Sequence, residues 1–349
     1  MTAKAALAGL AASVALAGLA AGPERAATGP EVAVLLPDSF GRWGVDRQYL
    51  SAALGKAGVA FTVADAHDSP AAQRSEAQAA MAAGAKVLLL ANVDAHAAAA
   101  IERGAKALGV RVIDYDRLTL RGAATFFVSF DAVKVGVLQG AGLVRCLKES
   151  GAYAKHPLVA ELNGSPSDSN SAAFKRGYDL VLGPLFRSGA LRKGPDRWID
   201  GWSPATAGRV FDGMLRSTRG GIGAVVAAND NLAGAVVSVL KGRGLAAIPV
   251  TGQDATPQGI QNVISGWQCM TVYKPARAEA DAAAAVAVSL LRGGRAPAAN
   301  ARVDDGSRLV PAVLETPIAI TKANWDRPIR DGYLRRADVC AGAYARYCR

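Results

Sequence analysis

Short apolar segments alternate regularly with longer amphipathic segments from residue 31 onward, and this alternation constrains the fold more than any other feature. The apolar segments are continuous, which is typical of strands buried on both faces of a parallel sheet. Strands that alternate with helices in this way predict an α/β fold with helices on both sheet faces. The expected strands are 31–36, 59–64, 86–91, 111–115, 126–130, 157–162, 190–194, 223–228, 248–251 and a last strand region within 309–320, and the expected helices are 44–57, 69–83, 95–108, 132–147, 170–182, 204–216, 230–242, 256–265 and 276–293.

The length of the chain predicts two domains. A chain of 349 residues is long for one domain and sufficient for two of about 130–150 residues each. We therefore expect two doubly wound parallel-sheet lobes joined by a multi-strand hinge, with the helix at 276–293 crossing back to the first lobe. The predicted boundaries are 31–130 plus 276–298 for the N-terminal lobe, 131–274 plus 299–321 for the C-terminal lobe, and 322–349 for a polar C-terminal tail.

Polar and aromatic residues follow directly on six of the apolar segments. Ligands of open parallel sheets bind just beyond the carboxyl ends of the strands, so these residues are expected to converge on one polar site. Together with Trp202 from a polar loop of the second predicted lobe, the candidate ligand-binding residues are Arg42, Trp43, Asp116, Arg117, Asn170, Trp202, Asn229, Asp254 and Lys274.

The chemistry of this set favours a neutral sugar as ligand. An indole can cover the apolar face of a sugar ring, and each predicted lobe supplies one, although either Trp could instead cap the core of its lobe. The remaining side chains mix donors with acceptors, as hydroxyls that both donate and accept require. A phosphate or carboxylate ligand would need donors without facing carboxylates. Other residues are expected to have structural roles: Asp114, Asp200 and Asp230 in turns or caps, and Trp198, Trp267 and Trp325 in packing.

Catalytic readings of the sequence are weaker. The sequence has no GxSxG, HExxH or GxxxxGK[ST] motif. A glycosidase that pairs Asp116 with Asp254 stays open by spacing, but Arg and Lys neighbours would lower the pKa of a carboxyl there, which is unsuited to a general acid. We expect a binding protein rather than an enzyme, with no catalytic residue, no metal site and no cofactor.

Charge and the N-terminal segment indicate an exported protein that does not bind nucleic acid. The formal charge of +11 arises from scattered residues, without the Lys/Arg run that marks a nucleic-acid patch. Lys4 precedes an unbroken stretch of small apolar residues over 5–21, which predicts a signal peptide over residues 1–26, cleaved on export to the periplasm. A membrane anchor is the alternative, but the stretch is short and weakly hydrophobic for a span.

The four cysteines divide into one predicted pair and two predicted thiols. Export permits disulfides, and Cys340 with Cys348 would close a small terminal loop. That bridge requires a turn, because an uninterrupted helix would hold the two residues roughly 12 Å apart. Cys146, at the end of a predicted helix, and Cys269, in an apolar strand, are expected to be buried thiols.

Several motifs, taken in order, resemble the type I periplasmic sugar-binding proteins of bacterial ABC importers, and within them the D-xylose-binding subfamily. The resemblance covers about 31 to 348. It is carried by Arg42-Trp43 with Asp46-Arg47, Tyr115-Asp116-Arg117, Ser129-Phe130-Asp131 with Lys134-Val135-Gly136, Gly164-Ser165-Pro166 with Asp168 and Asn170, Trp198-Ile199-Asp200-Gly201-Trp202, Asn229-Asp230, Gly252-Gln253-Asp254-Ala255, and Met270 to Pro275.

The resemblance implies a monomeric receptor that closes on a monosaccharide, D-xylose first, and delivers it to an ABC permease. It places the family's ligand contacts on the same nine residues that the chemistry selected. Ser169 departs from the subfamily, which often has a second Asn beside Asn170, and Asn92 and Asp94 depart after the third strand. We expect these positions to alter the fine specificity. The alternative function is a sugar-responsive transcriptional regulator, which reuses the same two-lobed core.

Overall fold

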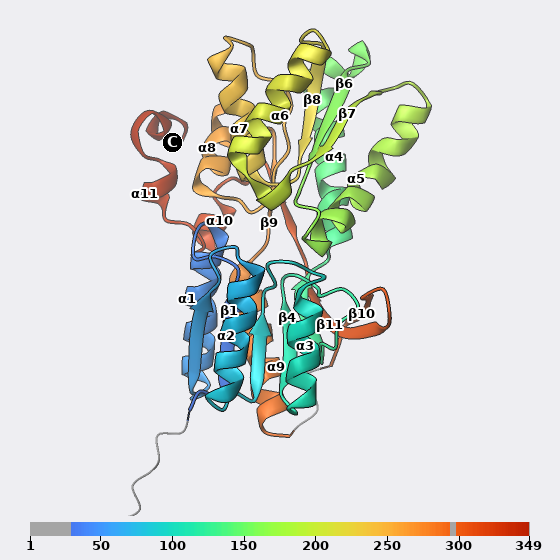
Figure 1. The fold of residues 1–349 in the computed structure, drawn as a ribbon. Coiled ribbons are helices and arrows are strands. Elements are labelled where there is room, and N and C mark those ends of the chain that lie inside the picture. The colour runs from blue at the N-terminus through green and yellow to red at the C-terminus, as the bar shows by residue number, and fades with distance from the viewer. Residues whose placement is uncertain (1–28, 294–297, 349) are drawn as a thin grey trace, which may run out of the picture.

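The computed structural model describes residues 29–293 and 298–348 (Figure 1). The predicted signal peptide therefore lies outside the described residues. None of the helices within those ranges is long and apolar enough to cross a membrane. The first lobe contains β1 (Val32–Leu36), α1 (Arg42–Lys56), β2 (Phe61–Asp65), α2 (Pro70–Ala82), β3 (Val87–Leu90), α3 (Ala98–Ala107), β4 (Arg111–Tyr115), β5 (Phe126–Phe130), α9 (Ala276–Leu291), β10 (Ala301–Asp304) and β11 (Leu309–Glu315).

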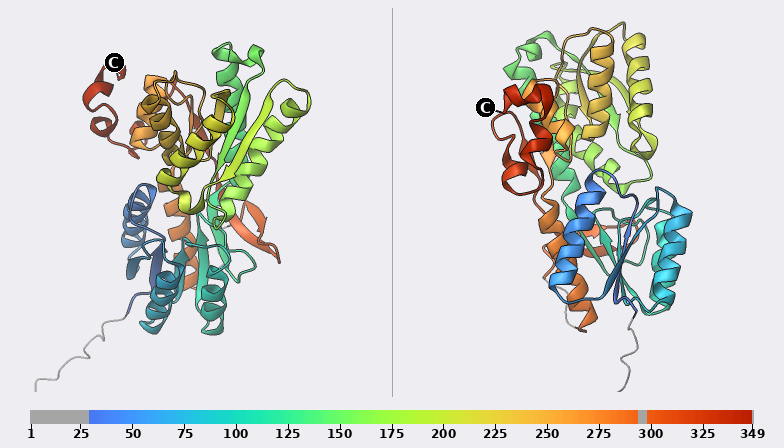
Figure 2. Two further views of the ribbon diagram at one scale, coloured as in Figure 1. Left: turned by 45° about the horizontal axis from the view of Figure 1, so that its top comes forward. Right: turned by 90° about the vertical axis from the view of Figure 1, so that its left-hand side faces the viewer.

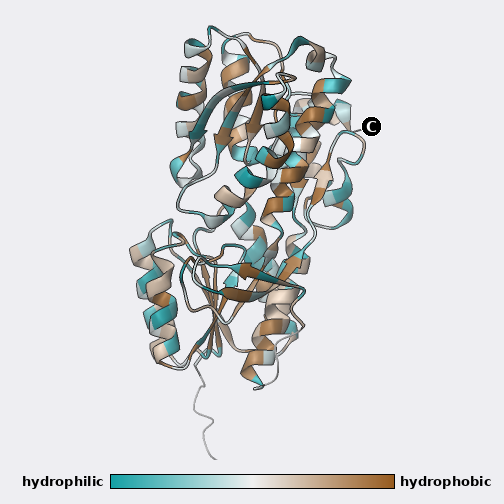
Figure 3. Cartoon of the chain, turned by 90° about the vertical axis from the view of Figure 1, so that its right-hand side faces the viewer, coloured by the Kyte–Doolittle hydropathy of each residue, from teal (hydrophilic) through white to brown (hydrophobic). Residues whose placement is uncertain are grey.

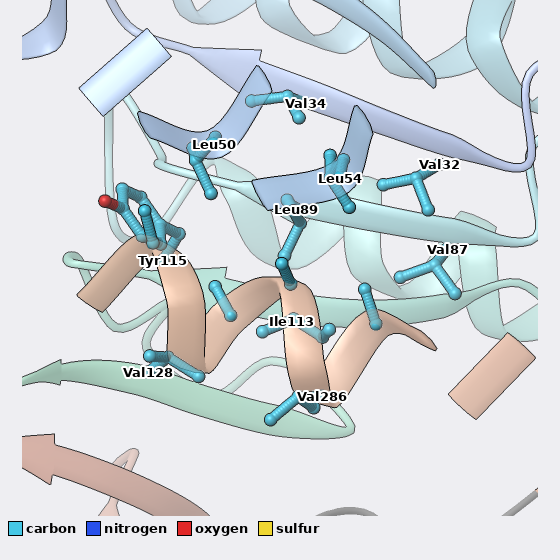
Figure 4. Close-up of a cluster of buried hydrophobic side chains, with 14 of the residues drawn as sticks. Val32, Val34, Leu50, Leu54, Val87, Leu89, Ile113, Tyr115, Val128 and Val286 are labelled. Carbon is cyan, nitrogen blue, oxygen red and sulfur yellow. The ribbon is translucent and has the colours of Figure 1, made fainter. Parts of the chain in front are cut away.

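The sheet of the first lobe has the strand order β10-β11-β5-β4-β3-β1-β2, and all its pairings are parallel except that of β10 with β11. Helices α1 and α9 cover one face and α2 and α3 cover the other (Figure 2). Figure 4 shows the core under α1 and α9, where Leu50 and Leu54 meet Val34 and Leu89. This double coverage explains the continuous apolar strands in the sequence.

Our assignment of 299–321 to the C-terminal lobe is wrong for β10 and β11. Strand β11 pairs in parallel with β5, with Ala312 opposite Phe127. Its buried residues Val310 and Ala312 pack with Phe127 and Leu118 of the first lobe. The apolar face of this hairpin thus completes the first sheet, and only β12 (Ile318–Ile320) joins the second lobe, where it pairs with β9.

The second lobe contains two smaller sheets, β7-β6-β8 and β12-β9, between helical layers. The expected strand at 248–251 is reduced to a single bridge between Val225 and Val250. Helices α4 and α5 pack on one side and α6 and α7 on the other. The elements are α4 (Ala132–Glu149), β6 (Leu158–Asn163), α5 (Ser169–Arg187), β7 (Arg192–Trp198), α6 (Pro204–Ser217), β8 (Ile222–Ala227), α7 (Asp230–Gly242), α8 (Pro257–Ser265) and β9 (Thr271–Tyr273).

Within the described ranges the chain passes between the lobes at three connections: from β5 to α4, from β9 to α9 and from β11 to β12. Figure 3 shows hydrophobic residues concentrated on the central strands of the lobes, while hydrophilic residues line the outer helix faces. Each lobe therefore has its own core, and the connections between them form a hinge of several strands.

The C-terminal tail is structured rather than simply polar. It forms α10 (Arg327–Arg330), α11 (Arg336–Val339) and a 3₁₀ helix (Gly342–Tyr347). The tail buries Val339 and Cys348 against Ile260 and Ile264 of α8. Its polar residues face outward, and its few apolar residues attach it to the second lobe.

Both pairs of cysteines form disulfides. The predicted bridge between Cys340 and Cys348 is confirmed, and the chain between α11 and the 3₁₀ helix provides the turn that it requires. The expectation that Cys146 and Cys269 are free thiols is wrong, since they are bonded with their Cα atoms 6.2 Å apart. Their separation of 123 residues hides the pairing, which arises only because the end of α4 packs beside the segment that leads into β9.

Candidate ligand-binding site

One cavity of about 290 Å³ lies between the two lobes, and all nine residues selected from the sequence line it. The first lobe supplies its share from the ends of β1 and β4, and the second lobe from the ends of β6, β8 and β9 and from the loops around them. The convergence follows from topology, because carboxyl ends of parallel strands meet at one edge of a sheet. The residues are Arg42, Trp43, Asp116, Arg117, Asn170, Trp202, Asn229, Asp254 and Lys274.

Arg42, the first residue of α1, is held by three carboxylates. Its guanidinium lies 2.8 Å from Asp46, 2.6 Å from Asp116 and 2.6 Å from Glu279. The i,i+4 spacing of Arg42 and Asp46 on a helix is a sequence signal for the first pair. Nothing in the sequence indicates the third, because Glu279 is 237 residues away. Tyr115 also donates to Asp46, with a distance of 2.5 Å.

This cluster fixes the protonation of Asp116 and Arg42. Burial opposes ionisation of Asp116, but Arg42, Lys274 and Arg117 outweigh it and lower the pKa of that carboxyl to about 2. Burial likewise disfavours charge on Arg42, yet the surrounding carboxylates raise its pKa well above the ordinary value. Burial dominates at Glu279 and raises its pKa well above the usual range. The cavity therefore presents an ionised Asp116 beside the charged guanidinium of Arg42.

Lys274 connects the two acidic residues of the site. Its Nζ lies 3.2 Å from Asp116 and 3.6 Å from Asp254. The Oδ1 atom of Asp254 is buried and accepts no hydrogen bond from any described residue. Asp254 also has a φ of 93°, in the left-handed region that non-glycine residues rarely adopt. A buried carboxylate oxygen that accepts no hydrogen bond from the described residues and lies beside the Lys274 ammonium is suited to accept one from a ligand hydroxyl.

Two guanidinium groups lie over the ring system of Trp43. The guanidinium groups of Arg42 and Arg117 each lie 5.1 Å from the centre of its ring system. Arg117 also donates to the carbonyl of Asn92 at 3.0 Å, and Asn92 donates in return to the carbonyl of Arg117 at 2.9 Å. Cation–π contacts of this kind fix the orientation of an indole that would otherwise rotate.

Trp202 is positioned by Asp168, a residue that our candidate set left out. Trp202 donates its indole N–H to Asp168 at 3.2 Å, and Arg117 of the other lobe lies 3.0 Å from the same carboxylate oxygen. Asp168 is also the N-cap of α5, where it accepts from the backbone N–H of Asn170 at 2.9 Å. In the sequence, the feature that could have drawn attention to Asp168 is its position before a predicted helix, but an N-cap position by itself suggests only a structural role. A Cβ atom at Gly164 would collide with the Trp202 ring.

Asn229 combines capping with exposure to the cavity. It is the N-cap of α7 and accepts from the backbone N–H of Leu232 at 3.0 Å. The adjacent Asp230 is buried and structural, as expected, and it accepts from Gln268 and Thr271, each at 2.8 Å. Gln253, which sequence reasoning also missed, lines the cavity with only 3% exposure and an Oε1 atom unpartnered within the described ranges.

Asp230 is expected to make folding stability depend on pH. Burial, with a contribution from Asp254, raises its pKa to about 7 despite three hydrogen-bond donors. The unfolded chain releases this proton near pH 3.9, so between about pH 4 and pH 7 the folded state holds up to one extra proton. The free energy of unfolding should then fall by up to about 1.4 kcal/mol per pH unit as pH rises, and level off above pH 7. Urea unfolding between pH 5 and pH 8 measures this slope. In the Asp230→Asn variant the free energy of unfolding should depend less steeply on pH, and a slope equal to that of the wild type would contradict the assignment.

The structure also shows where several other residues that the sequence singled out are located. Ser169 does not line the cavity with the nine residues, and its hydroxyl donates to the carbonyl of Leu118 in the first lobe at 2.8 Å. Asp114 fulfils its expected turn role by accepting from the backbone N–H of Thr119 at 2.6 Å. Trp198, expected in the core, is 41% exposed because it ends β7, an edge strand. The cavity rim adds Asp38, Phe40 and Asp68, which sequence reasoning did not select.

The arrangement can bind a polar ring without performing chemistry on it. The cavity is lined by two indoles, one from each lobe, together with cationic donors, anionic acceptors and amides. Asp116 and Asp254 both lie within ion-pair distance of Lys274, and the lowered pKa of Asp116 leaves that carboxyl without a proton to donate at neutral pH. Such a site is suited to recognition of hydroxyl groups.

The comparisons with known proteins agree with this geometry. A family model described as a periplasmic binding protein domain matches residues 32–295. The chain is 33% identical to the D-xylose-binding periplasmic protein of Escherichia coli (strain K12) over 300 residues, which cover 85% of this chain and 88% of that protein. It is 32% identical to the multiple sugar-binding periplasmic protein SbpA of Azospirillum brasilense over 349 residues, which cover 95% and 97%.

Solved structures show the same fold. An ABC transporter solute binding protein from Clostridium phytofermentans, with bound β-D-glucose, superposes with a TM-score of 0.82 at 27% identity, covering 88% of this chain and 99% of that one. A carbohydrate transporter solute binding protein from Chloroflexus aurantiacus, in complex with D-glucose, gives 0.80 at 28% identity, covering 88% and 98%. The family predicted from the motifs is thus confirmed, and the chain belongs to the type I periplasmic binding proteins, among relatives that are named for binding sugars.

Proposed function

We propose that this protein is an extracytoplasmic receptor of an ABC importer and that it binds a monosaccharide, D-xylose first, in the cavity between its lobes. The observation that carries the proposal is the composition of that cavity, where one indole from each lobe flanks a set of mixed donors and acceptors. Its volume of about 290 Å³ lies at the small end of the range for ligand pockets, which favours a single sugar ring over an oligosaccharide.

Ligand binding would act by favouring the closed arrangement of the lobes. A sugar that contacts both lobes binds the closed state better than an open one, and this difference in affinity shifts the equilibrium. The closed shape would then be recognised by the permease. The relatives are described as periplasmic, and the signal-peptide pattern over 1–26 supports export of this chain, which would act as a monomer.

A glycosidase is a weaker alternative. The pKa of about 2 for Asp116 is opposite to what a general acid needs. The relatives are named as binding proteins and not as hydrolases. Both observations favour a receptor without covalent chemistry.

Titration of the mature chain, residues 27–349, tests the proposal. Calorimetry and Trp fluorescence should report binding of D-xylose with an affinity of about 8–9 kcal/mol, and weaker binding of D-ribose, L-arabinose and D-glucose. Tight binding of D-glucose with no binding of D-xylose would contradict the choice of ligand but would still support a sugar receptor. No response to any of the four sugars would contradict the sugar site itself.

A further inference from the structure

The loop that carries Asp254 has an unfavourable backbone conformation. Asp254 and Ala255 have φ values of 93° and 48°, two consecutive non-glycine residues in the left-handed region. Such conformations persist only where the surroundings impose them, and they occur often at ligand-binding positions. The groups that hold this loop therefore determine where the Asp254 carboxylate lies.

Three hydrogen bonds hold the two residues, and one of them comes from the C-terminal tail. The backbone N–H of Asp254 donates to Val272 at 2.8 Å, and that of Ala255 donates to the Thr271 hydroxyl at 3.2 Å. The carbonyl of Asp254 accepts from the hydroxyl of Tyr333 at 3.0 Å. The first two partners belong to β9, whereas Tyr333 is 79 residues further along the chain.

Contacts of its ring and of its backbone hold Tyr333 in place. Its ring packs on Tyr273 with the ring centres 5.2 Å apart, and its backbone N–H donates to Pro328 at 2.9 Å. The preceding carbonyl, of Gly332, accepts from Tyr49 of α1 in the first lobe at 3.0 Å. Figure 1 and Figure 2 show α10 beside the end of α1 that faces the second lobe. Burial raises the pKa of Tyr333 well above the ordinary value, so its hydroxyl stays a donor.

We propose that Tyr333 is a positioning residue for the ligand site, through which the C-terminal tail holds the Asp254 carboxylate in place for its ligand. This inference rests on the proposed function for its ligand, and on the contacts of Tyr333 for its mechanism. The tail thereby acts on the cavity without lining it, since Tyr333 itself does not line the cavity.

The Tyr333→Phe variant tests the proposal, because it removes the hydroxyl and keeps the ring. Affinity for D-xylose should fall roughly five- to tenfold, the effect of one lost hydrogen bond. In the Asp254→Ala background the same change should alter affinity by less than about twofold, since the side chain through which Tyr333 acts is gone. A purely structural role would give equal losses in both backgrounds, which would overturn the proposal.

A second measurement needs no sugar. Backbone hydrogen exchange over 252–256 in the unliganded protein should be faster in Tyr333→Phe than in the wild type, because the loop has lost the hydrogen bond from the Tyr333 hydroxyl. Tyr347→Phe is the matched control, since that hydroxyl contacts Arg346 in the same tail and no site residue. Equal exchange in all three proteins would overturn the role of Tyr333. Failure of the wild type to bind any sugar would contradict the proposed function alone.

Discussion

Asp254→Ala is expected to weaken sugar binding by at least roughly 100-fold, or about 3 kcal/mol. The change removes a buried carboxylate oxygen that accepts no hydrogen bond from the described residues, and among those residues it leaves Lys274 with Asp116 as its carboxylate partner. Calorimetric titration with D-xylose measures the loss, and circular dichroism establishes that the variant is folded.

Two further variants separate the site from the fold. Asp254→Asn keeps the shape of the side chain and tolerates the left-handed backbone, so an intermediate loss is expected. Asp212→Ala removes a surface carboxylate that pairs with Arg216 and Arg243 and does not line the cavity, so affinity should not change. Near-normal affinity in Asp254→Ala would refute the assignment of this residue to the site.

Loss of the Cys146–Cys269 disulfide should lower the free energy of unfolding by about 5 kcal/mol. The bridge closes a loop of 123 residues, and the entropy that a cross-link removes from the unfolded chain grows with loop length. It also joins the end of α4 to the segment before β9, which leads to Lys274 and the hinge. Urea unfolding of a Cys146→Ala, Cys269→Ala double variant measures this effect.

The second disulfide provides the matched comparison. Cys340 and Cys348 are eight residues apart, so removing both should cost only about 2.5 kcal/mol. Each double variant replaces two cysteines and removes one disulfide, and the two variants differ in the length of the loop that the disulfide closed. If the terminal pair stabilised the protein as much as the long-range pair, the loop-closure explanation would be wrong.

The sequence was most informative where a feature of the protein depends on short stretches of neighbouring residues. Continuous apolar runs followed by polar residues were sufficient to predict the α/β class, and the nine residues chosen after those strands and in one polar loop line one cavity. This prediction succeeds because the geometry of parallel sheets brings strand ends together whatever the details of packing. The family resemblance rested on the same local motifs.

The sequence was least informative where contacts join distant segments. The bond between Cys146 and Cys269, the pairing of β11 with β5, and the contact of Arg42 with Glu279 span 123 residues or more and have no local signature. Asp168 appeared in the sequence only as part of a family motif, and the structure alone shows that it connects Trp202 to Arg117 of the other lobe.

By itself, therefore, the sequence determined the fold class, the family and nine of the residues that line the cavity. Only the tertiary structure decided which charges neutralise each other, which acceptor remains unpartnered, and how the tail reaches Asp254 through Tyr333. The physical reason is that secondary structure and strand-end position follow from periodic local patterns, whereas ion pairs and hydrogen bonds depend on distances that the packing of whole lobes sets.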